Sequence, residues 1–226
     1  EIAWSTKVHG SLPNIPELFA ACQKLTGGLP NIVTLDIPLG PQPITGRRAA
    51  DRLVTKAYIT RKAGTHSPTA QRPGPISRRL FEQLTQAGFR WLPANASPRQ
   101  KNNACVFLEV YPHPAIIELL NLPERLQYKM SKSQKYWPAL TREARGRAVA
   151  RNLNRLRLAL DKRITGVAKW LPPPQSFLKK KQRARLKGYE DALDAIACAW
   201  IGGEFLAGRC VAYGDADSAI WLPRPR

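Results

Sequence analysis

Two aspartates near the C-terminus, Asp191 and Asp194, have a spacing that could support metal chemistry. They lie in residues 188–200, where small and apolar residues predict a buried helix. Residues three apart on a helix share one side, a turn apart. The rest of that side is apolar, so the carboxylates need a cationic partner: a metal ion, a basic side chain or the helix N-terminus. A purely structural alternative is that the helix dipole stabilises acids in its first turn.

Two further carboxylates follow predicted strands. Asp36 ends the apolar, β-branched residues 31–36, and Glu109 lies near the end of the apolar residues 104–111. In an open α/β sheet, ligands gather beyond the carboxyl ends of the strands. Hard divalent cations such as Mg²⁺ prefer oxygen ligands, and paired metals can clamp a phosphoryl displacement. Together, these acids are suited to metal-assisted phosphoryl chemistry.

The elements that must position these acids can be read from periodicity and turn residues. Asn14 is a candidate N-cap for the first predicted helix and Ser77 for the third, while Gly27 and Gly208 are candidate terminators. Helices are predicted at residues 13–25, 45–58, 76–88, 116–120, 140–163 and 189–207. Strands are predicted at residues 2–8, 31–36, 104–111, 210–213 and 219–222. This pattern favours a single α/β domain over residues 1–226.

The chain is strongly basic, and its charge is unevenly distributed. The net charge is +20 and the sequence pI is about 10.4. Residues 123–187 carry 19 Lys and Arg against three acids and predict a basic, mainly helical insertion before the last helix. Such an excess favours a polyanionic partner, with nucleic acid as the leading candidate, although a charge run can also be a solvated face. The candidate nucleic-acid contacts are Arg47, Arg48, Arg142, Arg145, Arg151, Arg155, Lys179, Lys180 and Lys181.

Several other features have competing interpretations. Arg47, Arg48 and Arg52 could meet a scissile phosphate, or Asp51 could pair with them on a surface helix. His113 could shuttle protons near Glu109, or it could be a turn residue between two prolines. Both pairs of interpretations remain open at the level of the sequence.

The remaining composition narrows the class of protein. The cysteines have neither metal-site nor redox-motif spacing, which indicates buried thiols in a reducing compartment. No apolar run approaches the roughly 18–20 residues that span a bilayer, and no signal sequence opens the chain. We therefore expect a cytoplasmic protein without membrane contact.

Four ordered blocks resemble a predicted RNase H-like nuclease family, domain-of-unknown-function family 429. The blocks are residues 36–40, 46–51, 109–114 and 189–200, and residues 219–223 are also similar. The match is looser over residues 123–187. The resemblance implies an RNase H-like mixed sheet flanked by helices and a site for Mg²⁺ or Mn²⁺.

The same resemblance implies roles for individual acids. Asp36 would be the acid of the central strand and Glu109 that of the next strand. Asp191 and Asp194 lie on a helix similar to that of Holliday-junction resolvases in this superfamily. Asp36, Glu109 and Asp194 would be the principal metal ligands of the catalytic site, with Asp191 auxiliary. The superfamily's leading Asp, on a first strand, has no counterpart before Asp36, so we expect either a missing first strand or a lost ligand.

Three functions follow as hypotheses. The first is a metal-dependent nuclease that hydrolyses nucleic-acid phosphodiesters through the carboxylate cluster. The alternative is a non-catalytic nucleic-acid-binding module or ribonucleoprotein component with the same fold. A phosphotransferase of the actin-like ATPase fold is disfavoured because glycine-rich phosphate loops are lacking.

Overall fold

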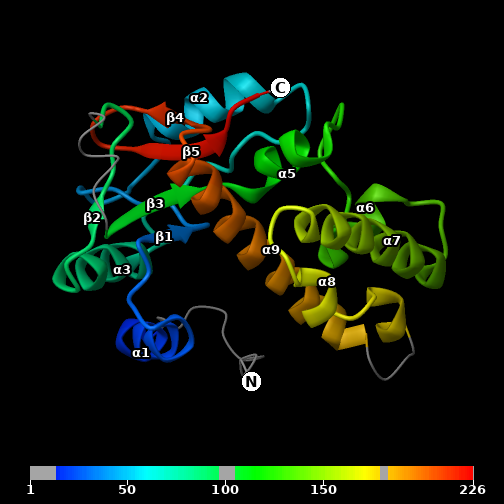
Figure 1. Ribbon diagram of the computed structural model, residues 1–226. Helices are drawn as coiled ribbons and strands as arrows, with labels where there is room; N and C mark the ends of the chain where they lie inside the picture. The colour runs from blue at the N-terminus through cyan, green and yellow to red at the C-terminus, as the bar shows by residue number, and fades with distance from the viewer. Residues whose placement is uncertain (1–13, 97–104, 179–182, 226) are drawn as a thin grey trace.

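A computed structural model describes residues 14–96, 105–178 and 183–225 (Figure 1). In these residues, a mixed sheet contains the strands β1 (Ile32–Leu35), β3 (Val106–Val110), β5 (Ala219–Pro223) and β4 (Cys210–Gly214), in that spatial order. The short strand β2 (Arg90–Trp91) pairs with the beginning of β3. β1, β2 and β5 run parallel to β3, whereas β4 is antiparallel to β5. The predicted α/β class is therefore confirmed.

The strand register brings the carboxyl ends of β1 and β3 side by side at one edge of the sheet, next to the beginning of β5. Leu35 of β1 and Ile220 of β5 both lie opposite Glu109 of β3. Every residue of β3 is buried, as expected for a central parallel strand covered on both faces. Asp36 directly follows β1 and so leaves the sheet beside the end of β3.

Helices cover the sheet and extend beyond it. The helices of eight residues or more are α1 (Ile15–Thr26), α2 (Ala49–Tyr58), α3 (Pro75–Gln86), α5 (Pro112–Leu120), α7 (Arg142–Asp161) and α9 (Arg183–Leu206). The shorter ones are η1 (Met130–Lys132), α6 (Ser133–Tyr136), α8 (Val167–Trp170) and η2 (Pro174–Phe177). The long helix α9 runs diagonally from the α7–α8 region to the sheet, where it packs on β1 and β5, while α2 packs on β4 and β5 (Figure 1).

The basic segment shares its hydrophobic core with the sheet. Leu153, Leu156 and Leu160 of α7 are fully buried in the same apolar cluster as residues of β3, β5 and α9. Arg157, on the same helix, is buried too, and its guanidinium donates to the carbonyls of Leu171 and Ala168 at 2.7 and 3.0 Å. These contacts attach α7 firmly to the rest of the molecule.

Two glycines allow close approaches that position the site. Gly202 of α9 faces β1 so closely that an added Cβ would lie 3.2 Å from a methyl group of Thr34. This contact holds α9 against β1 and directs the earlier turns of α9 toward the end of that strand. At the β4–β5 turn, Gly214 has φ +147°, and an added Cβ would lie 1.9 Å from the carbonyl oxygen of Ser218.

Most predicted elements are present, with some differences at their ends. Asn14 caps α1 as predicted, accepting from the Glu17 N–H at 3.2 Å. Ser77 does not cap α3, because that helix begins at Pro75 and the Ser77 hydroxyl instead donates to the Pro38 carbonyl. The helix predicted from residue 116 begins at Pro112, since proline is well suited to a first helical turn. The predicted strand at residues 2–8 lies outside the described residues, and β2 was not predicted.

No helix in the described part of the chain is both long enough and apolar enough to cross a membrane.

Candidate metal centre at the carboxyl edge of the sheet

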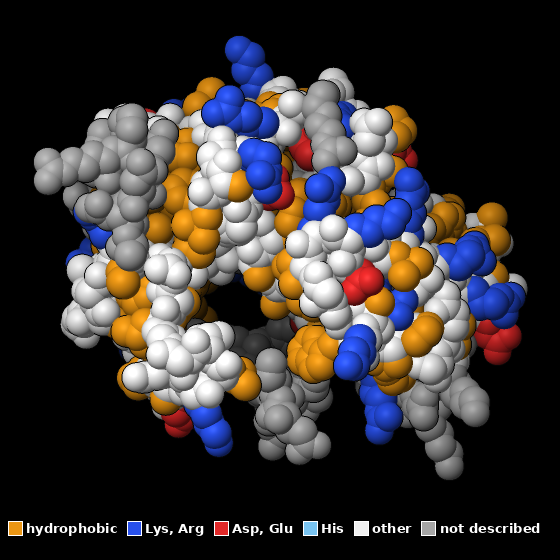
Figure 2. Space-filling model, viewed as in Figure 1, with side chains coloured by type: hydrophobic (Ala, Val, Ile, Leu, Met, Phe, Trp, Pro, Cys, Tyr) orange, Lys and Arg blue, Asp and Glu red, His pale blue; other side chains and the backbone are white. Residues whose placement is uncertain are grey.

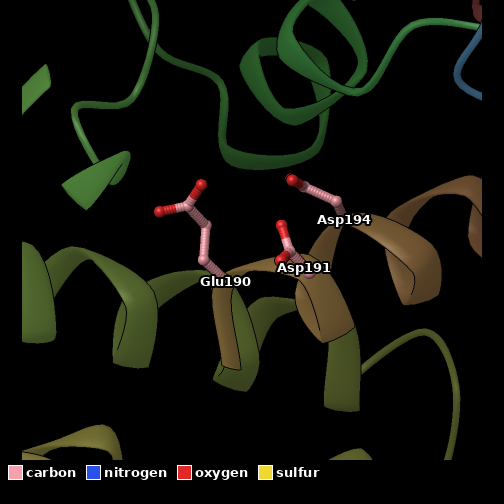
Figure 3. Close-up of side chains that lie close together, drawn as sticks. All are labelled: Glu190, Asp191 and Asp194. Atoms are coloured by element: carbon pink, nitrogen blue, oxygen red, sulfur yellow. The ribbon is translucent and has the colours of Figure 1, made fainter. Parts of the chain in front are cut away.

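Three carboxylates project from the same side of α9 (Figure 3). Glu190, Asp191 and Asp194 each offer an oxygen, and these oxygens lie within 4.8 Å of one another. This spacing could hold a metal ion. Because α9 begins at Arg183, about two turns before Glu190, the acids are not in its first turn. The dipole-based interpretation of the cluster is therefore wrong.

Two lysines supply the cationic partners that the acids require. Lys129 contacts Asp194 and lies 3.4 Å from a Glu190 oxygen. Lys187, one turn before the cluster, contacts Asp191 and lies 3.3 Å from Glu190. The cluster is thus already balanced in large part by basic side chains.

Hydrogen bonds from residues 128–130 also fix the cluster. The Tyr128 hydroxyl donates to Asp194 at 2.6 Å, and the Met130 N–H donates to Glu190 at 2.8 Å. Burial, together with the charge and hydrogen bond of Asp194, raises the pKa of Tyr128 well above its usual value, so it remains a donor. His113 Nδ1 lies 3.5 Å from the same hydroxyl. Burial and nearby cations lower the pKa of His113, so this ring is neutral and next to the centre.

Asp36 joins this centre from the sheet. Its side chain reaches solvent, yet protein surrounds it closely on the other sides. This partial loss of water raises the pKa of Asp36 to about 7, with the negative charge of Asp194 adding to the shift and Lys129 opposing it. The charge of Asp194 therefore acts on Asp36, and a role for Asp36 as a metal ligand stays a prediction.

Glu109 lies at the same edge of the sheet but has a different set of partners. Arg48 donates to both of its carboxylate oxygens at 2.6 Å, and the Leu39 N–H donates to one of them at 2.7 Å. Burial raises the pKa of Glu109 to about 7, while Arg48 and the Leu39 N–H oppose that shift. The short double contact is that of a charged pair. A role for Glu109 as a metal ligand stays a prediction.

Arg48 also binds Asp51, with two contacts of 3.0 Å. The predicted pairing with Asp51 is confirmed, but the pair is largely buried instead of lying on a surface helix. A small pocket of about 130 Å³ lies beside these residues. Its lining includes Asp36, Asp51, His66, Glu109 and Tyr111.

The predicted nucleic-acid contacts lie in different environments. Arg47 is exposed, whereas Arg48 is used in the buried pair. Arg142, Arg151 and Arg155 are exposed on α7, and Arg145 donates to the Leu140 carbonyl at 2.5 Å. Lys179, Lys180 and Lys181 lie outside the described residues.

Sequence reasoning missed three residues of the centre. Glu190 had a usable signal, because it precedes Asp194 by four residues and therefore lies on the same helical side. Tyr128 and Lys129 had none, since they meet Asp194 across 66 and 65 residues of chain.

The fold and the centre define a mixed α/β protein with a lysine-balanced acidic cluster at the carboxyl edge of its sheet. The model of one family, described as "Protein of unknown function (DUF429)", matches residues 3–218. The chain therefore belongs to the DUF429 family, which confirms the resemblance at that level. No curated protein and no solved structure matches the chain significantly.

Proposed function

We propose that this protein is a metal-dependent nuclease of RNase H-like fold, with Asp36, Glu190, Asp191 and Asp194 forming its acidic centre. The observation that carries the proposal is the cluster of Glu190, Asp191 and Asp194, whose carboxylate oxygens lie within 4.8 Å of one another. Asp36 leaves β1 at the carboxyl edge of the sheet, and the charge of Asp194 from α9 already raises the Asp36 pKa. Acids delivered by separate elements to one point are costly unless cations meet them.

The donor set is compatible with a hard divalent cation. All of the close ligand atoms are carboxylate oxygens, which Mg²⁺ and Mn²⁺ prefer. The ammonium groups of Lys129 and Lys187 lie against the same oxygens, so a metal would compete with them for the cluster. When bound, such a cation would polarise a phosphoryl oxygen and make water more acidic.

The chain's own residues would support the reaction in defined ways. Asp36, with a pKa of about 7, is poised to accept a proton from an attacking water near neutral pH. Tyr128 holds Asp194 in place through its short hydrogen bond. Lys129 could shift from Asp194 to a phosphate oxygen and neutralise charge that develops there.

A non-catalytic nucleic-acid-binding protein is the second candidate. One observation favours it: Lys129, Lys187 and Arg48 already compensate most of the acids that a metal would use. A fold that retained the acids only for internal ion pairs would show these contacts. The basic segment would then supply the binding function alone.

A cleavage assay separates the two candidates. The whole chain is incubated with duplex DNA, single-stranded DNA or RNA in Mg²⁺, in Mn²⁺ or in EDTA. The nuclease proposal expects metal-dependent cleavage that Asp36→Asn and Asp194→Asn each abolish. Glu82→Gln serves as the matched control, because Glu82 is an exposed acid paired with Arg78 on α3. Salt-sensitive binding without any cleavage would support the second candidate, and cleavage that survives Asp194→Asn would refute the first.

A further inference from the structure

Helix α7 carries a row of cations along one exposed face. Arg147, Arg151 and Arg155 are exposed on α7, and their spacing of four residues keeps them within one helical side. Lys162, the C-cap residue directly after α7, is exposed too and extends the row. We call these four residues the α7 stripe. At a rise of about 1.5 Å per residue, the stripe is about 22 Å long.

The stripe has no acidic partners among the described residues. None of the ion pairs there includes a member of the stripe. Asp161 of α7 instead accepts from the Ala168 N–H at 2.8 Å. The buried Arg157 shows the contrast, because its guanidinium is engaged by two backbone carbonyls. The cations of the stripe are therefore available to an external anion.

A groove runs beside the C-terminal half of the stripe. It has a volume of about 580 Å³ and lies between α5 and α7. Its described lining combines cationic and aliphatic side chains and includes no aromatic one: Leu119, Leu120, Arg155, Leu158, Ala159, Lys162 and Arg163. Lys and Arg side chains are spread over the part of the surface that α7 forms (Figure 2).

We propose that the α7 stripe and this groove bind the phosphate backbone of a nucleic-acid duplex. The inference rests on the proposed function, in which that duplex is the substrate of the acidic centre. Guanidinium groups suit phosphate because their donors form a planar fork. The cations of the stripe are regularly spaced along a rigid helix, and the groove beside them has no aromatic side chain in its described lining. Proteins that bind single strands instead interleave their cations with aromatic side chains on which the bases stack.

A lipid surface fits these observations less well. Helices that lie in a membrane interface pair a basic face with a broad apolar face of large side chains. Leu158 is the large apolar residue within the span of the stripe, and the opposite side of α7 is buried in the protein core. This face therefore offers charge without the apolar area that insertion requires.

Helix α7 is linked to the acidic centre through Asn152 and residues 127–129. Asn152, next to Arg151, donates its side-chain amide to the Gln127 carbonyl at 2.8 Å. Gln127 immediately precedes Tyr128 and Lys129, which contact Asp194. A duplex held on α7 would therefore be placed relative to the centre through one short, hydrogen-bonded segment.

The salt dependence of binding tests the inference. Fluorescence anisotropy is measured in EDTA with a labelled DNA duplex of about 24 base pairs, between about 50 and 200 mM salt. Each lost duplex phosphate contact lowers the slope of log K against log salt by about 0.9. The variant Arg147→Gln/Arg151→Gln/Arg155→Gln loses three contacts, so its slope should be smaller than that of the wild type by about 2.7. When salt rises from about 50 to 200 mM, the drop in affinity of the variant should therefore be about 40-fold smaller than the drop in affinity of the wild type.

A charge-matched variant separates local contacts from net charge. Lys24→Gln/Lys56→Gln/Arg79→Gln also removes three exposed cations, from α1, α2 and α3. We expect it to keep the wild-type slope. Arg142→Gln is a control on α7 itself, because Arg142 is exposed but lies on a different side from the stripe. Thermal unfolding of each variant verifies that the fold is retained, as expected for exposed positions.

Several results would overturn the inference. These are equal slope losses in the two triple variants, tighter binding of a single strand than of the duplex, or binding of polyglutamate or phosphatidylserine vesicles in preference to duplex. Because EDTA removes metal, the outcome is independent of cleavage. If the nuclease proposal fails while stripe-dependent duplex binding remains, the inference stands. Duplex cleavage that ignores the stripe would refute the inference and leave the nuclease proposal intact.

Discussion

Replacing Glu109 by Gln should destabilise the fold, because Glu109 lies in a buried ion pair. Its side chain is about 4% exposed, and Arg48 contacts both of its oxygens. The amide of Gln would retain one acceptor oxygen but would turn an NH₂ group toward the guanidinium. That leaves a buried cation facing a donor, and the Leu39 N–H competes for the one oxygen that remains.

The size of the effect follows from these contacts. Removing one partner of a buried ion pair costs about 3–5 kcal/mol. Arg48 would keep its two contacts with Asp51, so we expect the lower end, about 3 kcal/mol. For a chain of this size, 1 kcal/mol corresponds to about 2–4 °C in Tm, so the melting temperature should fall by about 6–12 °C.

Thermal and urea unfolding at about pH 8 measure this change, because Glu109 is ionised above its pKa of about 7. The matched control is Glu82→Gln, which removes an exposed ion pair between residues four apart on α3. Exposed helical pairs of this kind contribute about 0.3–0.5 kcal/mol, so the control should lower Tm by no more than about 2 °C.

The reasoning would be refuted if Glu109→Gln unfolded at the same temperature as the control. A variant with unchanged stability that no longer bound Mn²⁺ would show instead that Glu109 is a metal ligand. Loss of both properties would place the residue in both roles. Isothermal titration with Mn²⁺ on the same samples distinguishes these outcomes.

Three further predictions follow from the centre and the sheet. Lys129→Gln should tighten Mn²⁺ binding by about tenfold, or about 1.4 kcal/mol, because no ammonium group then competes with the metal for Asp194. Isothermal titration measures this change, and weaker binding would show instead that Lys129 supports the metal. Mn²⁺ affinity of the wild type should fall as the pH drops through about 7, because the raised pKa of Asp36 leaves a neutral carboxyl below it. Asp36→Asn should remove that dependence between about pH 6 and 8, and an unchanged profile would contradict the assignment. Gly214→Ala should lower the unfolding free energy by about 1–3 kcal/mol in urea, since φ is +147° and the added Cβ meets Ser218. Gly46→Ala is the control: this glycine has open space around it and no left-handed φ, so the change should alter the unfolding free energy by less than about 1 kcal/mol.

Strands β1 and β3 were predictable because their signals are local. Residues 31–36 and 104–111 are β-branched or apolar over the length of a strand, and they form β1 and β3. The start of α9 was misplaced by six residues, at 189 instead of Arg183. The preceding Lys- and Arg-rich residues were assigned to the basic insertion and not to this helix, although these residue types are good helix formers. This difference moved the acids from a first turn to the helix interior.

The centre was only partly predictable for a different reason. Asp36 and the acids of α9 can be predicted as members of the centre, because Asp36 lies at a strand end and the α9 acids lie on one helical side. The cationic partners of these acids cannot be predicted from the sequence, because every Lys and Arg of this basic chain is a candidate ion-pair partner for every acid. The choice between metal ligand and ion pair for Glu109 depends on the path of residues 37–48, which brings Arg48 back over the strand edge.

The sequence by itself determined the α/β class, the basic character of residues 123–187, and the positions of Asp36 and Glu109 at strand ends and of Asp191 and Asp194 on one helix. Composition, periodicity and local spacing are sufficient for these features. Only the tertiary structure decided which cation meets which acid: Lys129 for Asp194 across 65 residues, and Arg48 for Glu109 across 61. An ion pair requires contact within about 4 Å. Such contacts between distant segments arise only when the sheet register and the packing of α9 bring those segments together.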